Sequence, residues 1–395
     1  MSDTIQDFAL VESGDGVAAV DLVLPDRSDG ADGADGADGA DGPDPAVLDG
    51  LARKLRFVAA NDILRQRAVE PKVIWRAAPA GDSGDAARDV FGELLDRGIA
   101  TEAGDGQIAV GEPVLSLMDY LDARVRGLSL AEFGAAEYRY PTVLPAAVLR
   151  RCGYLESFPQ LLMFVARLHG DLDTYRQFID EMAGGRSLGE VLRTHAGHFD
   201  YCLPPTMCFH TYHQLADRPL PAPSAVVTSR GKSFRFESRY RRSLERLWDF
   251  TIREIVFIGS RDFVLDARSR LMERTFELAA ELGLGGHCEV ATDPFFVNAD
   301  TAQRVWSQQF LELKYELRLP IEPGRDVAVC SFNFHERFFA ESFAITAPTG
   351  ADDAEAALYT ACAGYGLERL AYAFLCQHGL DPGGWPQQVR KAVPW

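Results

Sequence analysis

The chain has 395 residues, of which 47% are hydrophobic and 25% charged, and its formal net charge at pH 7 is −18. These values are typical of a globular protein with two or three domains, or with one large domain and appendages. The acidic balance disfavours a large RNA partner because phosphate binding depends on Lys and Arg. No run of eighteen apolar residues and no basic, apolar leader occurs, so we expect a cytoplasmic protein without a membrane span or secretory signal.

The first 110 residues are expected to form two segments. Residues 1–45 contain one alternating apolar stretch, Val17 to Leu24, and then repeats of Asp-Gly-Ala. Gly and Asp at this density cannot bury a core, so Ser28 to Pro45 is predicted to be a flexible linker in an acidic N-terminal extension. Residues 46–110 are expected to form a helical segment, with helices over 46–67 and 85–97.

Residues 111–395 are expected to form the catalytic domain, in which helices precede a series of strands. Apolar spacing predicts helices over 113–126 and most of 160–196, and Glu137 begins a short strand. Beyond Phe199, β-branched and aromatic stretches predict strands over 225–228, 233–238, 250–258, 289–291, 295–297 and 327–334. Turn signals separate several of them (Ser229-Arg230-Gly231 and Glu322-Pro323-Gly324), helices are expected over 262–283 and 300–312, and a last helix runs from Gly366 through Ala373. The order lacks βαβα alternation, which predicts an α+β fold with an antiparallel sheet.

The segment around Arg235 is the first of three that carry chemistry. It reads Phe234-Arg235-Phe-Glu237, continues into a loop rich in arginine, and is followed by a second strand from Phe250 to Gly259. Two strands joined by a basic loop can hold an arginine over a phosphate. Taken alone, the same pattern is equally compatible with a surface hairpin that carries exposed ion pairs.

Two further segments lie toward the C-terminus. In Gly364-Tyr-Gly366-Leu-Glu368-Arg369, the glycines permit close approach of a ligand and the next helix presents an arginine, although a glycine turn before a core helix would look the same. In Cys330-Ser-Phe-Asn333-Phe-His335, the alternation places Ser331, Asn333 and His335 on one face of a strand, which could simply be a solvated face.

Together these segments resemble the catalytic core of class II aminoacyl-tRNA synthetases: Arg235-x-Glu237 resembles motif 2, the glycine-rich segment ending at Arg369 resembles motif 3, and the stretch before Pro141 and Pro145 could be a degenerate motif 1. Over roughly residues 88–395 the chain is similar to amino acid:[carrier protein] ligases, relatives of the atypical zinc-containing seryl-tRNA synthetases of methanogens. The resemblance implies a class II synthetase-like antiparallel sheet flanked by helices, with helical insertions, in a homodimer. The stretches that carry it are Gly153-Tyr-Leu-Glu-Ser-Phe-Pro-Gln160, Pro205-Thr-Met-Cys208, Ser331-Phe-Asn-Phe-His335 and Ala361-Cys362-Ala-Gly-Tyr-Gly-Leu-Glu-Arg369.

The resemblance also implies a catalytic zinc ion held by Cys208, Glu254 and Cys362. Two thiolates and a carboxylate suit Zn²⁺, and three protein ligands leave one position open for the α-amino group of a substrate. Seven cysteines, an odd number, in a long chain without an export signal favour free thiols or metal ligands over a disulfide framework. The other five are expected to be buried and inert: Cys152, Cys202, Cys288, Cys330 and Cys376.

The activity implied is ATP-dependent formation of an aminoacyl-adenylate. Arg235 would hold the α-phosphate and the substrate carboxylate, and Arg369 would hold the γ-phosphate. Glu237 would contact the adenine and Phe250 would stack beneath it. Mg²⁺ is expected on the phosphates with Glu316 as an acidic ligand, and Asn333 would face the amino acid.

The implied acceptor is the phosphopantetheine thiol of a carrier protein, and the amino acid would be small, such as glycine, alanine or serine. A tRNA acceptor is disfavoured because the N-terminal region is acidic and its linker cannot form a tRNA-binding arm. Arg150-Arg151 and Arg186 to Arg193 are candidate docking sites for the carrier. Two alternatives stay open: a synthetase that acts on tRNA with a partner RNA-binding subunit, and a non-catalytic synthetase paralogue.

Overall fold

The computed structural model describes residues 7–13, 16–23, 48–50, 52–53, 72–79, 89–237, 243–291, 313–348 and 357–393. The chain divides into two compact units, residues 1–69 and 70–395. In the first unit, β1 (Asp7–Ser13) and β2 (Gly16–Val23) pair as an antiparallel hairpin, and β2 contains most of the alternating apolar stretch. The expected linker from Ser28 to Pro45 lies outside the described residues, as does most of the expected helix over 46–67.

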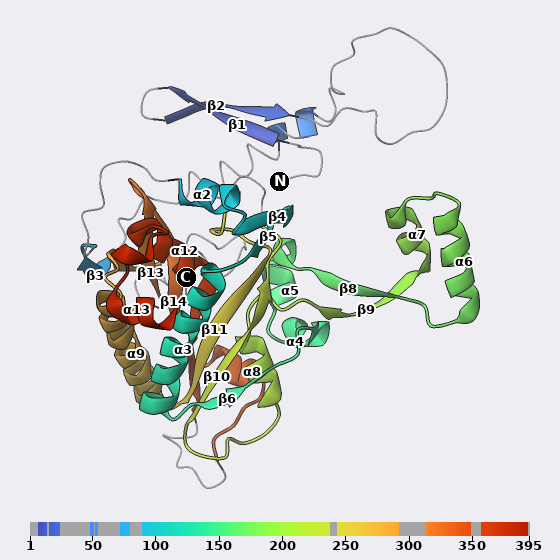
Figure 1. Cartoon of the computed structure of the whole chain (residues 1–395). Helices are drawn as coiled ribbons and strands as arrows, with labels where there is room; N and C mark the ends of the chain where they lie inside the picture. The colour runs from blue at the N-terminus through green and yellow to red at the C-terminus, as the bar shows by residue number, and fades with distance from the viewer. Residues whose placement is uncertain are drawn as a thin grey trace. The chain divides into compact units, whose positions relative to one another are not determined.

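The second unit is built on an eight-stranded sheet (Figure 1). Neighbouring strands are antiparallel except for β10 and β6, which are parallel. This arrangement confirms the predicted α+β class with a large antiparallel sheet. The strand order is β3 (Val73–Ala77), β12 (Gly286–Val290), β13 (Lys314–Glu322), β14 (Arg325–Phe334), β15 (Tyr359–Gly366), β11 (Asp249–Gly259), β10 (Ala225–Phe234) and β6 (Ala136–Tyr138).

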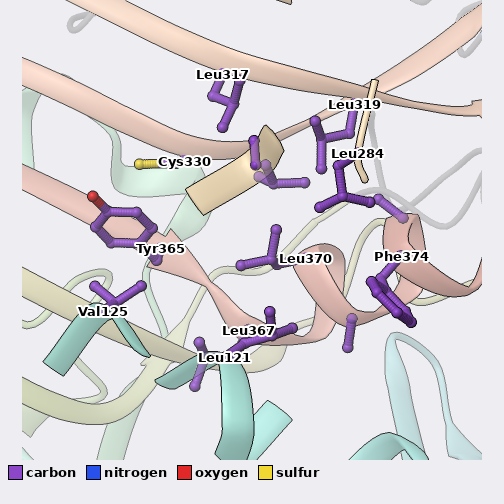
Figure 2. Close-up of a cluster of buried hydrophobic side chains, with 14 of the residues drawn as sticks. Leu121, Val125, Leu284, Leu317, Leu319, Cys330, Tyr365, Leu367, Leu370 and Phe374 are labelled. Carbon is purple, nitrogen blue, oxygen red and sulfur yellow. The ribbon is translucent and has the colours of Figure 1, made fainter. Parts of the chain in front are cut away.

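Three helices pack on one face of this sheet: α3 (Val114–Phe133), α9 (Arg261–Glu281) and α12 (Leu367–His378). Figure 2 shows Leu317 and Leu319 of β13 pointing toward Leu367 and Leu370 of α12. The side chains of Leu319 and Leu367 are fully buried. Burial of apolar surface of this kind contributes roughly 25 cal/mol per Å² and is the main force that holds the helices on the sheet.

The opposite face of the sheet is covered by α4 (Ala146–Arg151), α8 (Cys208–Gln214) and α11 (Phe338–Ser342). Their buried side chains form a second cluster with Val256 and Ile258, whereas Ile255 and Phe257 of the same strand belong to the first core. Consecutive residues of β11 therefore serve opposite faces, as the two-residue period of a strand requires.

Arg253 of β11 lies on the face of the sheet that is covered by α3, α9 and α12, and it is only 2% exposed. Its guanidinium donates to Asp122 of α3 at 2.7 and 2.9 Å, and to Glu137 of β6 at 3.0 Å. A buried guanidinium is tolerated only when it is paired and hydrogen-bonded, so this contact fixes which face of β11 meets α3.

An insertion interrupts the unit. It begins after α5 (Tyr154–Ser157) and the 3₁₀ turn η3 (Pro159–Leu161), and it ends before α8. The strands β8 (Phe164–Leu168) and β9 (Ala196–Cys202) form an arm that carries α6 (Leu172–Ala183) and α7 (Leu188–His195) at its outer end (Figure 1), and β7 (Leu144–Pro145) pairs with β9. Asp171 and Ser187 cap the two helices by accepting from the backbone N–H groups of Thr174 and Glu190. The helical prediction for 160–196 is right for α6 and α7 but missed β8.

Two further expectations are wrong. The described part of 46–110 is not all helical: beside α2 (Val90–Asp96) it contains β3, β4 (Ala100–Gly104) and β5 (Gln107–Val110). Ser229-Arg230-Gly231 is not a turn but the middle of a continuous β10, which pairs with β11 at all three residues. A Cβ at Gly231 would lie 2.5 Å from Cε of Met207. That glycine serves close packing rather than chain reversal. The domain boundaries expected at 45/46 and 110/111 stay predictions.

Strand β13 was not predicted, although Lys314, Glu316 and Arg318 alternate with its core residues, because it contains few of the β-branched residues by which the other strands were found. The expected strand over 295–297 and helix over 300–312 lie outside the described residues. The helix expected from Gly366 to Ala373 is α12, which begins at Leu367 and continues to His378, but it is not the last one, because α13 (Gln387–Ala392) follows. Among the described residues, no helix has the length and apolar character to cross a membrane.

The pairing of Arg253 predicts a stability difference between two aspartates of α3. Asp122→Ala leaves the buried guanidinium without its main partner and should lower the free energy of unfolding by about 3–5 kcal/mol. Asp119→Ala removes a carboxylate whose side chain is 67% exposed and pairs with Arg230, so the loss should stay below about 1 kcal/mol. Urea unfolding of both variants measures this, and equal losses would contradict the prediction.

Candidate active site and metal centre

A pocket of about 1020 Å³ lies between the sheet and helices α5, α8 and α11. Its lining comes from β11, β13, β14, β15 and the segment that follows β10, so segments far apart in the sequence meet there. The structure brings all the sequence-predicted site residues to this one pocket: Cys208, Arg235, Glu237, Phe250, Glu254, Glu316, Asn333, Cys362 and Arg369.

Three of these residues form a compact cluster of potential metal ligands. Cys208 is the first residue of α8, Glu254 lies in the middle of β11, and Cys362 lies on the neighbouring β15. One sulfur or carboxylate oxygen of each lies within 4.8 Å of the other two, and all three residues are buried. Among the described residues this is the group of His, Cys, Asp and Glu side chains that could hold a metal ion.

The environment of Glu254 fits a cation. One carboxylate oxygen, Oε1, accepts from the hydroxyl of Thr206, while Oε2 is buried and has no hydrogen-bond partner. A buried carboxylate oxygen without a partner is costly, and a metal ion between it and the two sulfurs would compensate that cost. Two thiolates and one carboxylate are a donor set suited to Zn²⁺, with a coordination position left over.

The two thiols of the cluster are not equivalent. The Cys208 thiol donates to the Cys362 sulfur, and this bond holds the pKa of Cys362 below its usual range although burial opposes it. The His335 ring and the Asn333 amide also contact that sulfur, both at 3.6 Å, and act in the same direction. The same bond, together with burial, raises the pKa of Cys208. Cys362 is therefore the thiol that is prepared as a thiolate.

Glu254 is affected in the opposite direction. Burial, followed by the negative charge of Cys362, raises the pKa of Glu254 to about 8. Cys208, Glu254 and Cys362 are thus three acidic groups in a small volume, and none of the three is positively charged. Such a cluster stores unfavourable electrostatic energy that a divalent cation would remove.

Two arginines also line the pocket, Arg235 and Arg369. The Arg235 guanidinium donates to the carbonyl of Pro205 at 3.1 Å and lies 5.4 Å over the ring of Phe250. Arg369 donates to the carbonyls of Glu245 and Ala328.

Arg369 is held close to other positive groups. Burial, followed by the charges of Arg235 and Arg246, lowers the pKa of Arg369 to about 10. Arginines held this close repel one another, and a polyanionic ligand between them relieves the repulsion. Glu237 lies beside them and accepts from Arg246 at 2.9 Å.

Glu316 and Asn333 lie on the adjacent strands β13 and β14 and line the same pocket. Glu316 is 7% exposed and contacts Lys314 at 2.7 Å and Arg318 at 3.1 Å. Burial opposes its ionisation, but these two cations hold the pKa of Glu316 below its usual range. Asn333 donates to Ser331 and Cys362 through Nδ2, and its buried Oδ1 has no hydrogen-bond partner, which leaves an acceptor available to a ligand.

Some residues of the site were not identified from the sequence. Thr206 fixes the orientation of Glu254, and His335 contacts Cys362 while its Nδ1 lies 3.4 Å from the hydroxyls of Tyr212 and Thr360. The alternation of Ser331, Asn333 and His335 did place His335 on the right face. Nothing in the sequence pairs Thr206 with a glutamate on another element.

The hydrogen bond from Thr206 predicts a measurable effect on metal affinity. Thr206→Val keeps the shape of the side chain but removes the donor, and loss of such an outer partner typically weakens metal binding by about 10- to 100-fold. Thr228→Val is the matched control, since the Thr228 hydroxyl donates to the backbone carbonyl of Glu254 at 2.9 Å. Titration with Co²⁺, followed by thiolate-to-cobalt absorption, should show weaker binding for Thr206→Val alone. Equal affinity of both variants would contradict the assignment.

The sequence of this chain is similar to those of several named ligases. Amino acid–[acyl-carrier-protein] ligase 1 of Bradyrhizobium diazoefficiens is 34% identical over 311 residues, which cover 78% of this chain and 91% of that protein. Ligase 2 of the same organism is 37% identical over 254 residues, covering 64% and 72% respectively. A type-2 serine–tRNA ligase of Methanococcus maripaludis is 29% identical over 300 residues, but the alignment spans only 57% of its length. No protein-family model matches the sequence.

Comparison with solved structures confirms the class II synthetase fold. The chain aligns with the crystal structure of A. aeolicus tRNASec in complex with M. kandleri SerRS at a TM-score of 0.70 and 23% identity, covering 99% of this chain and 73% of that one. A cytoplasmic serine–tRNA ligase from Naegleria fowleri in complex with AMP aligns at a TM-score of 0.61 and 10% identity, covering 88% and 80%. With the two Bradyrhizobium ligases aligned over most of their length, the chain belongs to the amino acid–[acyl-carrier-protein] ligase family and is a ligase.

Proposed function

We propose that this ligase activates a small amino acid with ATP as the aminoacyl-adenylate and transfers it to the phosphopantetheine thiol of a carrier protein. The observation that carries the proposal is the composition of one pocket: Cys208, Glu254 and Cys362 form a cluster of metal ligands, and Arg235 and Arg369 line the same pocket. A ligand with an amine at one end and phosphates at the other fits this arrangement of charge. Glycine, alanine and serine are the proposed substrates.

Cys208, Glu254 and Cys362 would hold a zinc ion. Bound there, zinc would supply a Lewis-acidic position that takes the neutral α-amino group and so orients the amino acid. Thr206 keeps Glu254 in place, and Asn333 offers an unpaired acceptor in the same part of the pocket. These residues therefore select the amino group rather than a large side chain.

In the first step, a carboxylate oxygen of the amino acid attacks the α-phosphorus of ATP. The bond from that phosphorus to the bridging oxygen breaks, and pyrophosphate leaves with Mg²⁺. Arg235 would neutralise the carboxylate and the α-phosphate, and Arg369 the γ-phosphate. Glu237 and Phe250 would bind the adenine, and Glu316 is the proposed acidic ligand of Mg²⁺. Positioning and charge neutralisation supply the catalysis.

In the second step, the carrier thiol attacks the carbonyl carbon of the adenylate, loses its proton and displaces AMP, which leaves a thioester. The carrier is the proposed acceptor because two relatives at 34% and 37% identity are named for it. Arg150-Arg151 and Arg186 to Arg193 are the proposed docking residues of the ligase for the carrier. Two of these arginines are paired within the chain, Arg151 with Asp217 and Arg186 with Glu181. A homodimer is part of the proposal, from the likeness to class II synthetases.

The metal proposal predicts that Cys208→Ala removes both stoichiometric zinc and amino acid-dependent ATP–pyrophosphate exchange. Two ligands cannot hold zinc tightly, and the amino group then has no anchor. Cys202→Ala is the control, since Cys202 is equally buried but contacts the carbonyl of Leu144. Metal analysis and exchange rates measure the effect, and retention of zinc and exchange in Cys208→Ala would rule out the assignment.

The acceptor is tested by the fate of a labelled amino acid. Incubated with ATP, the ligase should transfer the label to a phosphopantetheinylated carrier protein and not to the apo-carrier, which lacks the thiol. The bond should be cleaved by hydroxylamine, as a thioester is. Label that reaches tRNA and never the carrier would instead establish the synthetase alternative.

A further inference from the structure

We propose that Trp248, held in place by the β4–β5 hairpin, is a positioning residue that orients Arg235 and Glu237 for ATP. The inference rests on the proposed function, since it concerns the nucleotide end of the same pocket. It assigns a role to the hairpin of residues 100–110, which lies far from the pocket residues in sequence and contributes no side chain to the pocket lining.

Trp248 contacts each of three consecutive residues on the other side of the loop that begins after β10. Its backbone carbonyl accepts from the N–H of Arg235 at 3.0 Å, and its indole Nε1 donates to the carbonyl of Glu237 at 2.8 Å. Its ring lies 4.6 Å from the ring of Phe236. One residue thus fixes the backbone on both sides of Phe236, and with it the starting points of the Arg235 and Glu237 side chains.

The hairpin holds Trp248 from the opposite side. The backbone N–H of Trp248 donates to the carbonyl of Gly106 at 2.8 Å. A Cβ at Gly106 would lie 2.3 Å from Cδ1 of the indole, so the ring packs directly against the glycine backbone. Gly106 also has φ +61°, a conformation that glycine adopts without strain. Only a glycine allows this turn and this contact together.

The exposure of these side chains argues against a simple core role. Trp248 is half-buried, and Phe236 is 48% exposed. Neither ring is fully buried, so their packing stabilises the fold less than that of large aromatic side chains in a core. What the contacts do is restrict the backbone at 235–237, where a displacement of about 1 Å can cost 100-fold in rate.

Two glycines of the same region provide a matched test. Gly98 and Gly106 have φ values of +67° and +61°, but a Cβ at Gly98 would meet nothing within 4 Å. Gly106→Ala and Gly98→Ala therefore carry the same backbone strain, and only the first displaces the indole. In the full-length zinc-loaded protein, Gly106→Ala should raise the KM for ATP in pyrophosphate exchange, and the Kd for ATP by calorimetry, about tenfold or more. The zinc content should not change, and the KM for the amino acid should rise less than that for ATP, because Arg235 also meets the substrate carboxylate whereas Glu237 serves ATP alone. Gly98→Ala should match the wild type.

A second variant separates orientation from folding. Trp248→Phe keeps an aromatic ring beside Gly106 but removes the donor to Glu237, and should raise the KM for ATP about three- to tenfold with an unchanged KM for the amino acid. ATP affinities that are equal in Gly106→Ala, Gly98→Ala and wild type, or KM values that rise equally for both substrates, would overturn the inference. A wild-type protein that binds ATP but exchanges no pyrophosphate would overturn the proposed function instead, and the calorimetric comparison would still decide the role of Trp248.

Discussion

The buried ion pair between Arg253 and Asp122 fixes the register on which the site depends. Arg253 faces α3 and Glu254, the next residue, faces the pocket. A shift of one residue in β11 would exchange the two faces, bringing a carboxylate toward Asp122 and a guanidinium toward Cys208 and Cys362. Both exchanges would place like or unpaired charges in buried positions, so the alternative register is strongly disfavoured.

The pocket contains both acidic and cationic groups, and their placement follows from the pairing of strands. Glu254 and Cys362 lie on the neighbouring strands β11 and β15, and α8 brings Cys208 against them. The arginines enter from the end of β10 and from the first turn of α12. The pocket therefore holds a cluster of acidic groups with an unpaired oxygen and, elsewhere in its lining, guanidinium groups that repel one another.

Much of this could be predicted from the sequence where the signal is local. The β-branched run in β11, the apolar spacing in α9 and the glycines before α12 predicted a strand of the sheet and two of its helices. β13 and the β4–β5 hairpin were missed because they contain few β-branched or aromatic residues and no continuous apolar run. For the site, the cysteines and arginines stand in recognisable motifs. Thr206 and Trp248 do not, because their importance comes from hydrogen bonds to Glu254 and Glu237 that only the fold creates.

The arm formed by β8, β9, α6 and α7 differs from the sheet in how it is held together. No residue of α6 is buried, and in α7 only Val191 and His195 are. Leu172 and Ile179 are 60% and 62% exposed. With so few buried contacts, the arm is expected to open in local fluctuations at a small fraction of the free energy needed to unfold the sheet. Substitutions in the arm should therefore be nearly neutral for the cooperative unfolding of the sheet, which leaves the arm free to change in sequence and length while the catalytic pocket is preserved.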